Sequence, residues 1–128
     1  MAFPDAELVL LSLLDDLGYT CTALPDPDQF DAQMPIIVCN RIGGGVDGLG
    51  ITDNALCAIL VIHDTRPLAW QVTAQVRQRI LKAGCTEVDG ILIDTTSEVV
   101  GNQEVMDINP ENRMVDSTFY LSFREMRS

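Results

Sequence analysis

The residues with the most chemical potential are two cysteines and the only histidine. Cys39 and Cys57 each lie within an apolar run, and His63 directly follows the second run. A thiol becomes a catalytic nucleophile when a base such as histidine activates it. The apolar surroundings favour another interpretation, that both are buried free thiols of a cytosolic protein. A catalytic Cys–His pair is the alternative.

Metal and acid–base sites need several ligands close together, and the sequence offers few. Asp15 and Asp16 are adjacent, but their neighbours supply no third ligand. His63 and Asp64 would point to opposite faces of a strand, so they should not form a relayed pair. The cysteines are far apart and form no Cys-x-x-Cys motif: Cys21, Cys39, Cys57 and Cys85. We therefore expect no catalytic residue, no metal and no cofactor.

A glycine-rich segment follows the first strong strand. Gly43, Gly45 and Gly48 spell the G-x-G-x-x-G pattern of dinucleotide-binding loops. Such a site needs a helix that starts at the loop and presents its N–H groups to the pyrophosphate. Here the segment leads through residues 52–54 into another strand. We therefore expect residues 43–50 to form a long, mobile hairpin connection that becomes ordered on contact with a partner.

A central strand and a long helix should form the scaffold. Residues 55–62 are eight consecutive apolar residues, which favours a strand buried on both faces. Thr65 and Pro67 are typical of a helix start, and Gly84 of the position just after a helix end. The apolar stripe of this helix contains Ala69, Val72, Val76, Ile80 and Ala83.

The remaining elements follow from local patterns. A leucine-rich helix is predicted for residues 5–17. Its last turn should fray unless a basic group docks there, because Asp15 and Asp16 oppose the helix dipole. Strands are predicted for residues 19–24, 36–42, 86–100 (one strand or a bent pair, with a bulge at Gly90) and 113–124, and polar loops for residues 25–35 and 101–112. On the last strand the expected buried face comprises Met114, Ser117 or Thr118, Phe119, Leu121 and Phe123.

This order of elements predicts the fold class. We expect one α+β domain over residues 1–128, with a mostly antiparallel sheet of about four to five strands and two helices packed on one face.

Charge excludes one class of function. The chain has 128 residues, 47% of them hydrophobic, and a formal net charge of −11. Residues 1–64 carry ten acidic residues and one basic residue, whereas residues 65–128 carry nine acidic and seven basic residues. Phosphate binding needs clustered Lys and Arg, so most of this surface should repel nucleic acid. It should suit a basic partner, or a passage that DNA crosses without sticking. We expect neither a signal peptide nor a membrane span.

Five short segments, spread over nearly the whole chain, occur in an informative order. They are Phe3-Pro4-Asp5-Ala6, Met34-Pro35-Ile36-Ile37-Val38, Ala58-Ile59-Leu60-Val61-Ile62, Ala74-Gln75-Val76-Arg77, and a closing strand that follows Asn112-Arg113 and ends Phe119-Tyr120-Leu121-Ser122-Phe123-Arg124. In this order the chain resembles the tail terminator (tail completion) proteins of long-tailed bacteriophages.

The resemblance implies a non-enzymatic structural protein of the virion. Such proteins form a ring, usually a hexamer, that caps the tail tube, ends its polymerisation and joins it to the head-side connector. The implied partners are further copies of the chain, the major tail tube protein and the connector or stopper protein, without a membrane. DNA would pass through the ring without specific binding. The implied location is the head–tail junction of a virion assembled in the host cytoplasm.

We expect the loops at residues 43–50 and 101–112 to contact neighbouring molecules. The expected interface residues are Arg41, Gly44, Val46, Asp47, Leu49, Met106, Asp107, Arg113, Arg124 and Arg127. Three alternatives remain open: a head–tail stopper or other minor tail protein, a small cytosolic thiol enzyme, and a monomeric acidic adaptor.

Overall fold

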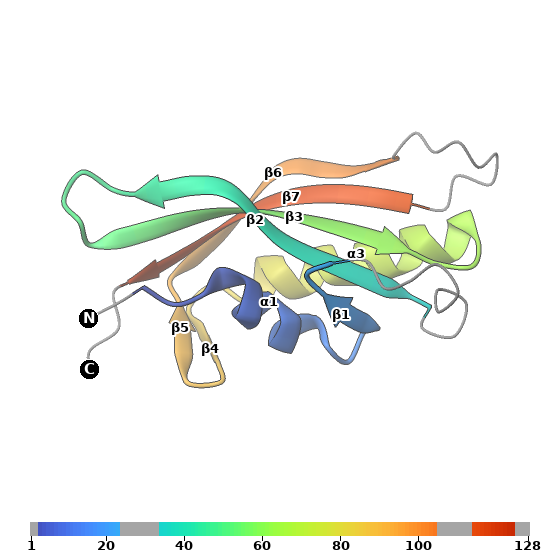
Figure 1. The fold of residues 1–128 in the computed structure, drawn as a ribbon, viewed down its shortest axis with the longest axis horizontal. Helices are drawn as coiled ribbons and strands as arrows, with labels where there is room; N and C mark the ends of the chain where they lie inside the picture. The colour runs from blue at the N-terminus through green and yellow to red at the C-terminus, as the bar shows by residue number, and fades with distance from the viewer. Residues whose placement is uncertain (1–2, 24–33, 105–113, 125–128) are drawn as a thin grey trace.

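The fold was determined as a computed structural model, which describes residues 3–23, 34–104 and 114–124 (Figure 1). Its elements are, in chain order, α1 (Ala6–Leu14), β1 (Tyr19–Cys21), β2 (Ile36–Val46), β3 (Thr52–Ile62), α3 (Arg66–Lys82), β4 (Thr86–Val88), β5 (Ile91–Ile93), β6 (Thr95–Glu104) and β7 (Met114–Arg124). In the described residues, neither helix is long and apolar enough to cross a lipid bilayer.

The main sheet has five strands in the order β1-β2-β3-β7-β6. The β1–β2 pair is parallel, and the three other pairs are antiparallel. Both helices lie on the same face of this twisted sheet, and the separate β4–β5 hairpin projects beside α1 (Figure 1). The predicted fold class, an α+β domain with a mostly antiparallel sheet, is confirmed.

Burial along β3 corrects the prediction of a strand buried on both faces. Every second residue from Asp53 to Val61 is fully buried, and those between them are half-buried. The reason is that the helices cover one face alone. On the opposite face a smaller cluster of Ile36, Val38 and Ile62 is buried near the far end of the strands.

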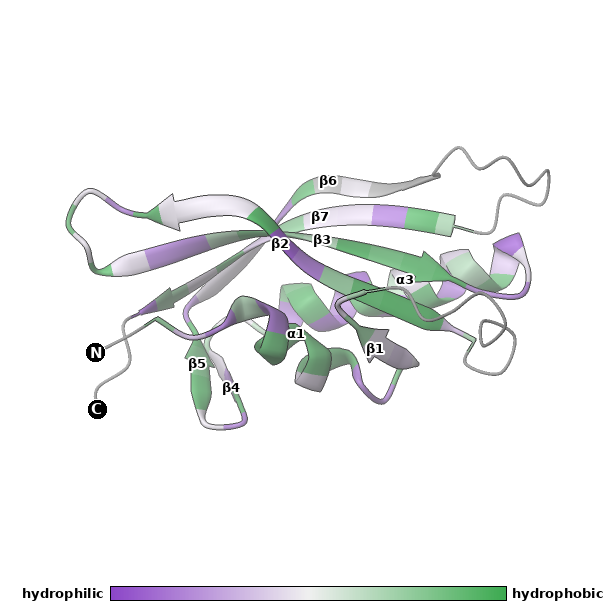
Figure 2. Ribbon diagram, in the orientation of Figure 1, coloured by the Kyte–Doolittle hydropathy of each residue, from purple (hydrophilic) through white to green (hydrophobic). Residues whose placement is uncertain are grey.

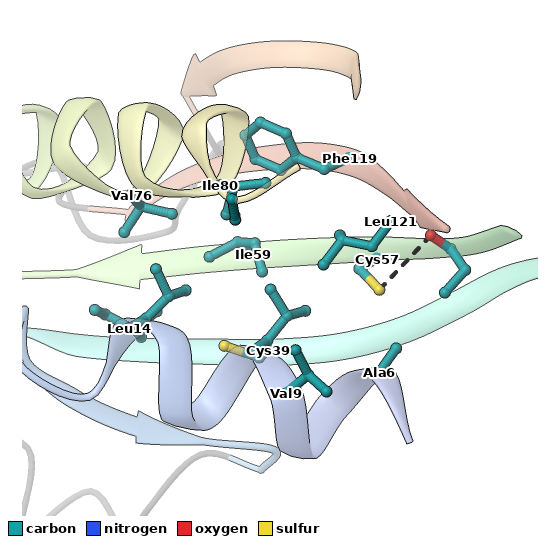
Figure 3. Close-up of a cluster of buried hydrophobic side chains, with 14 of the residues drawn as sticks. Ala6, Val9, Leu14, Cys39, Cys57, Ile59, Val76, Ile80, Phe119 and Leu121 are labelled. Atoms are coloured by element: carbon teal, nitrogen blue, oxygen red, sulfur yellow. Dashed lines mark hydrogen bonds between the residues drawn. The ribbon is translucent and has the colours of Figure 1, made fainter. Parts of the chain in front are cut away.

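The main core lies between the two helices, α1 and α3, and the covered face of β2, β3 and β7 (Figure 3). All five residues of the predicted stripe on α3 are buried. Thr65 caps α3 as predicted, because its Oγ1 accepts a hydrogen bond from the N–H of Leu68. Helix α3 ends at Lys82 with Ala83 as its C-cap, so Gly84 follows the helix end as predicted; the left-handed residue is the next one, Cys85 (φ 64°).

Helix α1 is shorter than predicted, and its end is stabilised as the sequence required. Asp5 lies before the helix and caps it by accepting a hydrogen bond from the N–H of Glu7 (3.0 Å). Beyond the last turn, Arg79 of α3 donates to the carbonyl of Leu13 (2.9 Å) and to the carboxylate of Asp16 (2.7 Å). A cation therefore docks at the negative end of α1 and ties the two helices together.

Residues 86–100 form a hairpin and the start of another strand. Asp89 and Gly90 make a two-residue turn between β4 and β5 with φ of 51° and 79°, so the predicted bulge at Gly90 is wrong. On β7 the buried residues include Val115, Ser117, Phe119, Leu121 and Phe123. The placement of Met114 on that face is also wrong, because it packs against the smaller cluster on the opposite face.

The predicted loops at residues 43–50 and 101–112 begin later than expected, and residues 25–33 of the predicted loop at 25–35 lie outside the described residues. The glycines at positions 43–45 belong to β2, which continues to Val46, so the connection is shorter than the predicted residues 43–50. Strand β6 continues to Glu104, so residues 101–104 are strand as well. Residues 105–112 of the second predicted loop lie outside the described residues.

The hydroxyl of Ser117 is buried without a hydrogen-bond partner among the described residues. A buried, unpaired hydroxyl destabilises the folded state, so Ser117→Ala should raise the free energy of unfolding by about 1 kcal/mol. Thr73→Val is the control, because the Thr73 hydroxyl donates to the Ala69 carbonyl (2.7 Å) and its loss should lower stability. Urea unfolding measures both; a loss of stability in Ser117→Ala would show that its hydroxyl is satisfied.

Candidate functional site

The β2–β3 hairpin continues past the region that the helices cover. We call residues 41–54 the distal hairpin. In Figure 2, the parts of β2 and β3 that lie against the helices are mainly hydrophobic. Toward the hairpin the same strands become mainly neutral to hydrophilic, and hydrophobic residues appear again near the tip. Several apolar side chains of the distal hairpin are exposed, including those of Ile42 (58%), Val46 (48%) and Leu49 (82%). This hairpin holds half of the expected interface residues.

A β-bulge lies at the base of the distal hairpin. The register of β2 against β3 shifts between Arg41 and Gly43. The backbone N–H of Arg41 donates to the carboxylate of Glu7 on α1 (2.9 Å). Helix α1 thereby satisfies a backbone donor on the edge of β2, beyond the three residues that β1 covers.

An ion pair crosses the distal hairpin. The guanidinium of Arg41 donates to both carboxylate oxygens of Asp53, at 2.6 and 2.7 Å. The Asp53 side chain is 5% exposed, and its hydrogen bonds raise the pKa of Arg41. Arg41, expected at an interface, therefore neutralises a buried carboxylate of its own chain. The pair fixes β2 against β3 beyond the hydrophobic core.

Gly44 is required by the close approach of the two strands. Its φ is +87°, and a Cβ at this position would lie 1.9 Å from the carbonyl oxygen of Asn54. A side chain would clash with the β3 backbone, so the glycine here serves strand pairing. The nucleotide-binding interpretation fails as expected, because the segment passes from strand to turn to strand and no helix starts there.

The tip is an ordered turn that presents apolar side chains. The Asp47 carboxylate accepts hydrogen bonds from the N–H groups of Ile51 (2.9 Å) and Thr52 (3.4 Å), which lower its pKa. Leu49 and Ile51 are exposed at this turn. A structured apolar protrusion is typical of a surface that contacts another molecule.

A groove of about 540 Å³ runs across the uncovered face of the sheet at the same end. Four strands contribute to it, and Asp47 is its only charged lining residue among those described. The lining residues are Gly44, Gly45, Val46, Asp47, Asn54, Thr95, Ser97, Tyr120 and Ser122. Small, uncharged side chains dominate, so this face can approach another polypeptide closely.

The thiols and the histidine do not form a catalytic site. Cys39 and Cys57 are fully buried as predicted (Figure 3), and burial raises the pKa of each to about 12. His63 lies six residues beyond Cys57 and four residues beyond Ile59, which pairs with Cys39. At the rise of an extended strand these separations are about 20 Å and about 13 Å. The Nδ1 of His63 accepts a hydrogen bond from the backbone N–H of Asp64 (2.7 Å). The structure therefore does not bring the proposed nucleophile and base together.

The acidic pair at the end of α1 has a structural partner. Arg79 donates to Asp16 and lowers the pKa of its carboxyl group. Within residues 3–23, 34–104 and 114–124, no three His, Cys, Asp or Glu residues are placed to hold a metal ion. Asp16 thus stabilises helix packing.

The structure brings several of the expected interface residues to one end of the sheet. Gly44, Val46, Asp47 and Leu49 lie on the distal hairpin, and Arg124 of β7 pairs with Thr52 beside the tip. The Arg124 side chain is 67% exposed and lies 3.7 Å from Asp94. The remaining candidates lie outside the described residues: Met106, Asp107, Arg113 and Arg127.

Sequence reasoning missed other exposed apolar residues. Ile42 and Ile51 are exposed and lie on either side of the glycine-rich segment. Because β-branched residues favour strands, these two residues were the available signal that the strands are longer. Leu8 (60% exposed) lines a second cavity of about 490 Å³ between α1 and the β4–β5 hairpin. The sequence gives no signal that Leu8 is exposed, because it is one of many leucines in this helix.

Comparison with known proteins places the chain in a family. Residues 2–128 match the family model of the phage tail termination protein, so the chain belongs to this family. It is therefore a structural protein of a phage tail and a component of the phage particle. The resemblance seen in the sequence is confirmed.

Structural comparison agrees at the level of the fold. The chain is similar to one in the structure titled "Virion of native gene transfer agent (GTA) particle", with a TM-score of 0.62 and 15% identity. The similarity covers 94% of this chain and 86% of the other. No curated protein matches the sequence.

Removing Arg41 should cost far more stability than removing Arg79. Arg41→Met leaves the buried Asp53 carboxylate unpaired and should lower the free energy of unfolding by about 3 kcal/mol. Arg79→Met breaks a pair with the exposed Asp16, which solvent screens, and should cost much less stability. Urea unfolding of the two variants compares them. Equal losses would contradict a structural role for the Arg41–Asp53 pair.

Alkylation should separate the exposed thiol from the two buried thiols. At pH 8 iodoacetamide should modify the exposed Cys85 first, and Cys39 and Cys57 after unfolding, because burial keeps both protonated and covered. Peptide mass spectrometry measures the order. Rapid modification of Cys39 or Cys57 in the native protein would revive the thiol-enzyme interpretation.

Proposed function

We propose that this protein terminates the phage tail tube. Copies of the chain assemble into a ring, which we propose is a hexamer, at the end of the tube. The ring ends tube polymerisation and joins the tail to the head-side connector or stopper protein. We place it at the head–tail junction of a virion assembled in the host cytoplasm.

The observation that carries the proposal is the family match over residues 2–128. The surface of the molecule is compatible with a ring, which needs two different complementary patches on each copy. The acidic N-terminal half and the more balanced C-terminal half provide surfaces of different charge. A net charge of −11 also supports passage of DNA through the ring without specific binding.

The contacts with neighbours are proposed to involve the distal hairpin and the region around residues 105–113. Gly44, Val46, Asp47 and Leu49 would contact another molecule directly, whereas Arg41 would act by holding the hairpin in place. The proposed cations for ion pairs between subunits are Arg113, Arg124 and Arg127, and Met106 and Asp107 complete the proposed interface.

The direct test is a tube-capping assay. Purified protein is added in small amounts to polymerising major tail tube protein, and tube lengths are measured by electron microscopy. A terminator should shorten the tubes and appear as extra density at one end. Unchanged lengths with binding to the connector alone would favour a stopper. Binding to neither, by a monomer, would favour an acidic adaptor.

Charge reversal tests the proposed ion pair. Arg124→Glu should weaken assembly about tenfold, or about 1.4 kcal/mol per contact, because it replaces an exposed cation with a carboxylate. Lys82→Glu, an exposed cation on α3, is the matched control and should assemble normally. Analytical ultracentrifugation measures both. Intact assembly of Arg124→Glu would remove this residue from the interface.

A further inference from the structure

We propose that neighbouring copies join edge to edge, with β2 of one copy pairing with β6 of the next. The sheets of successive copies would then form one continuous antiparallel sheet around the ring. This inference rests on the proposed ring and names the surface that closes it.

Each copy has two open sheet edges. In the described part of the chain, β1 covers β2 at Ile36–Val38, and Glu7 takes the N–H of Arg41. Beyond the bulge, residues 43–46 pair with β3 on one side and, among the described residues, have no strand on the other. At the opposite edge, β7 is the one described strand that pairs with β6 (Figure 1).

The strand directions make the two edges compatible. Strands β2, β3, β7 and β6 are antiparallel to one another in turn, so β6 runs opposite to β2. In a ring, every copy is related to the next by a rotation, so a given strand makes the same angle with the ring axis in every copy. The β6 edge of one copy therefore meets the β2 edge of the next in antiparallel orientation, which is the stronger pairing pattern.

The regular parts of the two edges lie at the same level of the sheet. Gly45 pairs with Asn54, Asn54 with Ser122, and Ser122 with Thr95. This row joins residues 43–46, which follow the bulge in β2, to residues 95–98, which precede the irregularity in β6. A closed ring forms by rotation without a rise, so edges that meet must lie near one level.

Two of the residues that commonly protect an exposed edge, lysine and proline, are absent from both stretches, residues 43–46 and 95–98. A Cβ at Gly45 would meet no atom within 4 Å, so a strand can approach closely there. Val46 (48% exposed) and Val99 (46% exposed) lie at these edges, and pairing would bury them. Open edges that lack lysine and proline are expected where another strand pairs.

The charges favour a second copy of the same chain as the occupant. Residues 43–46 carry no charge, and Glu98, the one charged residue of residues 95–98, is paired with Arg77. Two copies of a protein with a net charge of −11 repel one another, and the repulsion is smallest where unpaired charges are absent. These edges are such places.

Lysine substitutions at the two edges provide the first test. Gly45→Lys and Ser97→Lys place a charge on exposed positions outside the core, and the backbone of Gly45 is not left-handed. Each should reduce ring formation, measured by native mass spectrometry, at least tenfold with an unchanged melting temperature. Gln71→Lys is the control, because Gln71 is exposed and lies on α3, outside both sheet edges and outside the distal hairpin. It should assemble normally.

Disulfide cross-linking locates the contact directly. In a Cys85→Ser background, Gly45→Cys with Ser97→Cys, and Gly43→Cys with Ser97→Cys, should give covalent dimers and higher oligomers on oxidation. Gly45→Cys with Gln75→Cys, on the exposed face of α3, should remain monomeric on a denaturing gel. Two edge pairs are used because a tilt of the strands shifts the register between copies.

The outcomes separate the two proposals. If the wild-type protein forms rings, but the lysine variants also form rings and no edge pair cross-links, the edge contact is overturned and the ring stands. If the wild-type protein forms no ring, alone or with the tail tube, the terminator proposal itself fails. Loss of rings together with edge-specific cross-links establishes the β2–β6 contact.

Discussion

The position of the distal hairpin depends on the bulge at Arg41 and Gly43. The hydrophobic core ends near this point, so strand pairing beyond it needs another source of stability. Three contacts provide it: the Arg41 N–H to Glu7, the Arg41 guanidinium to the buried carboxylate of Asp53, and the close approach of Gly44 to β3. A bulge increases local twist and re-aims the strand. Together, the bulge and these three contacts hold the apolar tip of the distal hairpin away from the helices.

This arrangement separates the stable part of the molecule from the part available for assembly. Helices α1 and α3 cover one face of the sheet, and Arg79 joins the helices to each other. In the part of the chain that the structure describes, the opposite face at the hairpin end, the tip and the two sheet edges remain open. A structural protein of a phage tail needs a stable core that is separate from its binding surface, because the surface must bind neighbours while the core is already folded.

The sequence predicted the features that depend on local patterns. The stripe on α3, the cap at Thr65, and the need for a cation near Asp16 follow from residues a few positions apart. The glycines were misplaced in a loop because glycine has low strand propensity, whereas Gly44 is needed for contact with Asn54, ten residues along the chain. The Arg41–Asp53 pair depends on hairpin register, which a bulge shifts. The open edges emerge from the strand order, which no local pattern encodes.

The most direct test of the central claim is the native mass of the purified protein, with negative-stain images of the same sample, alone and with the tail tube. We expect rings with a central hole and a mass near six times the 14.0 kDa subunit. A 14.0 kDa monomer in both conditions, with no ring on the tube ends, would contradict it.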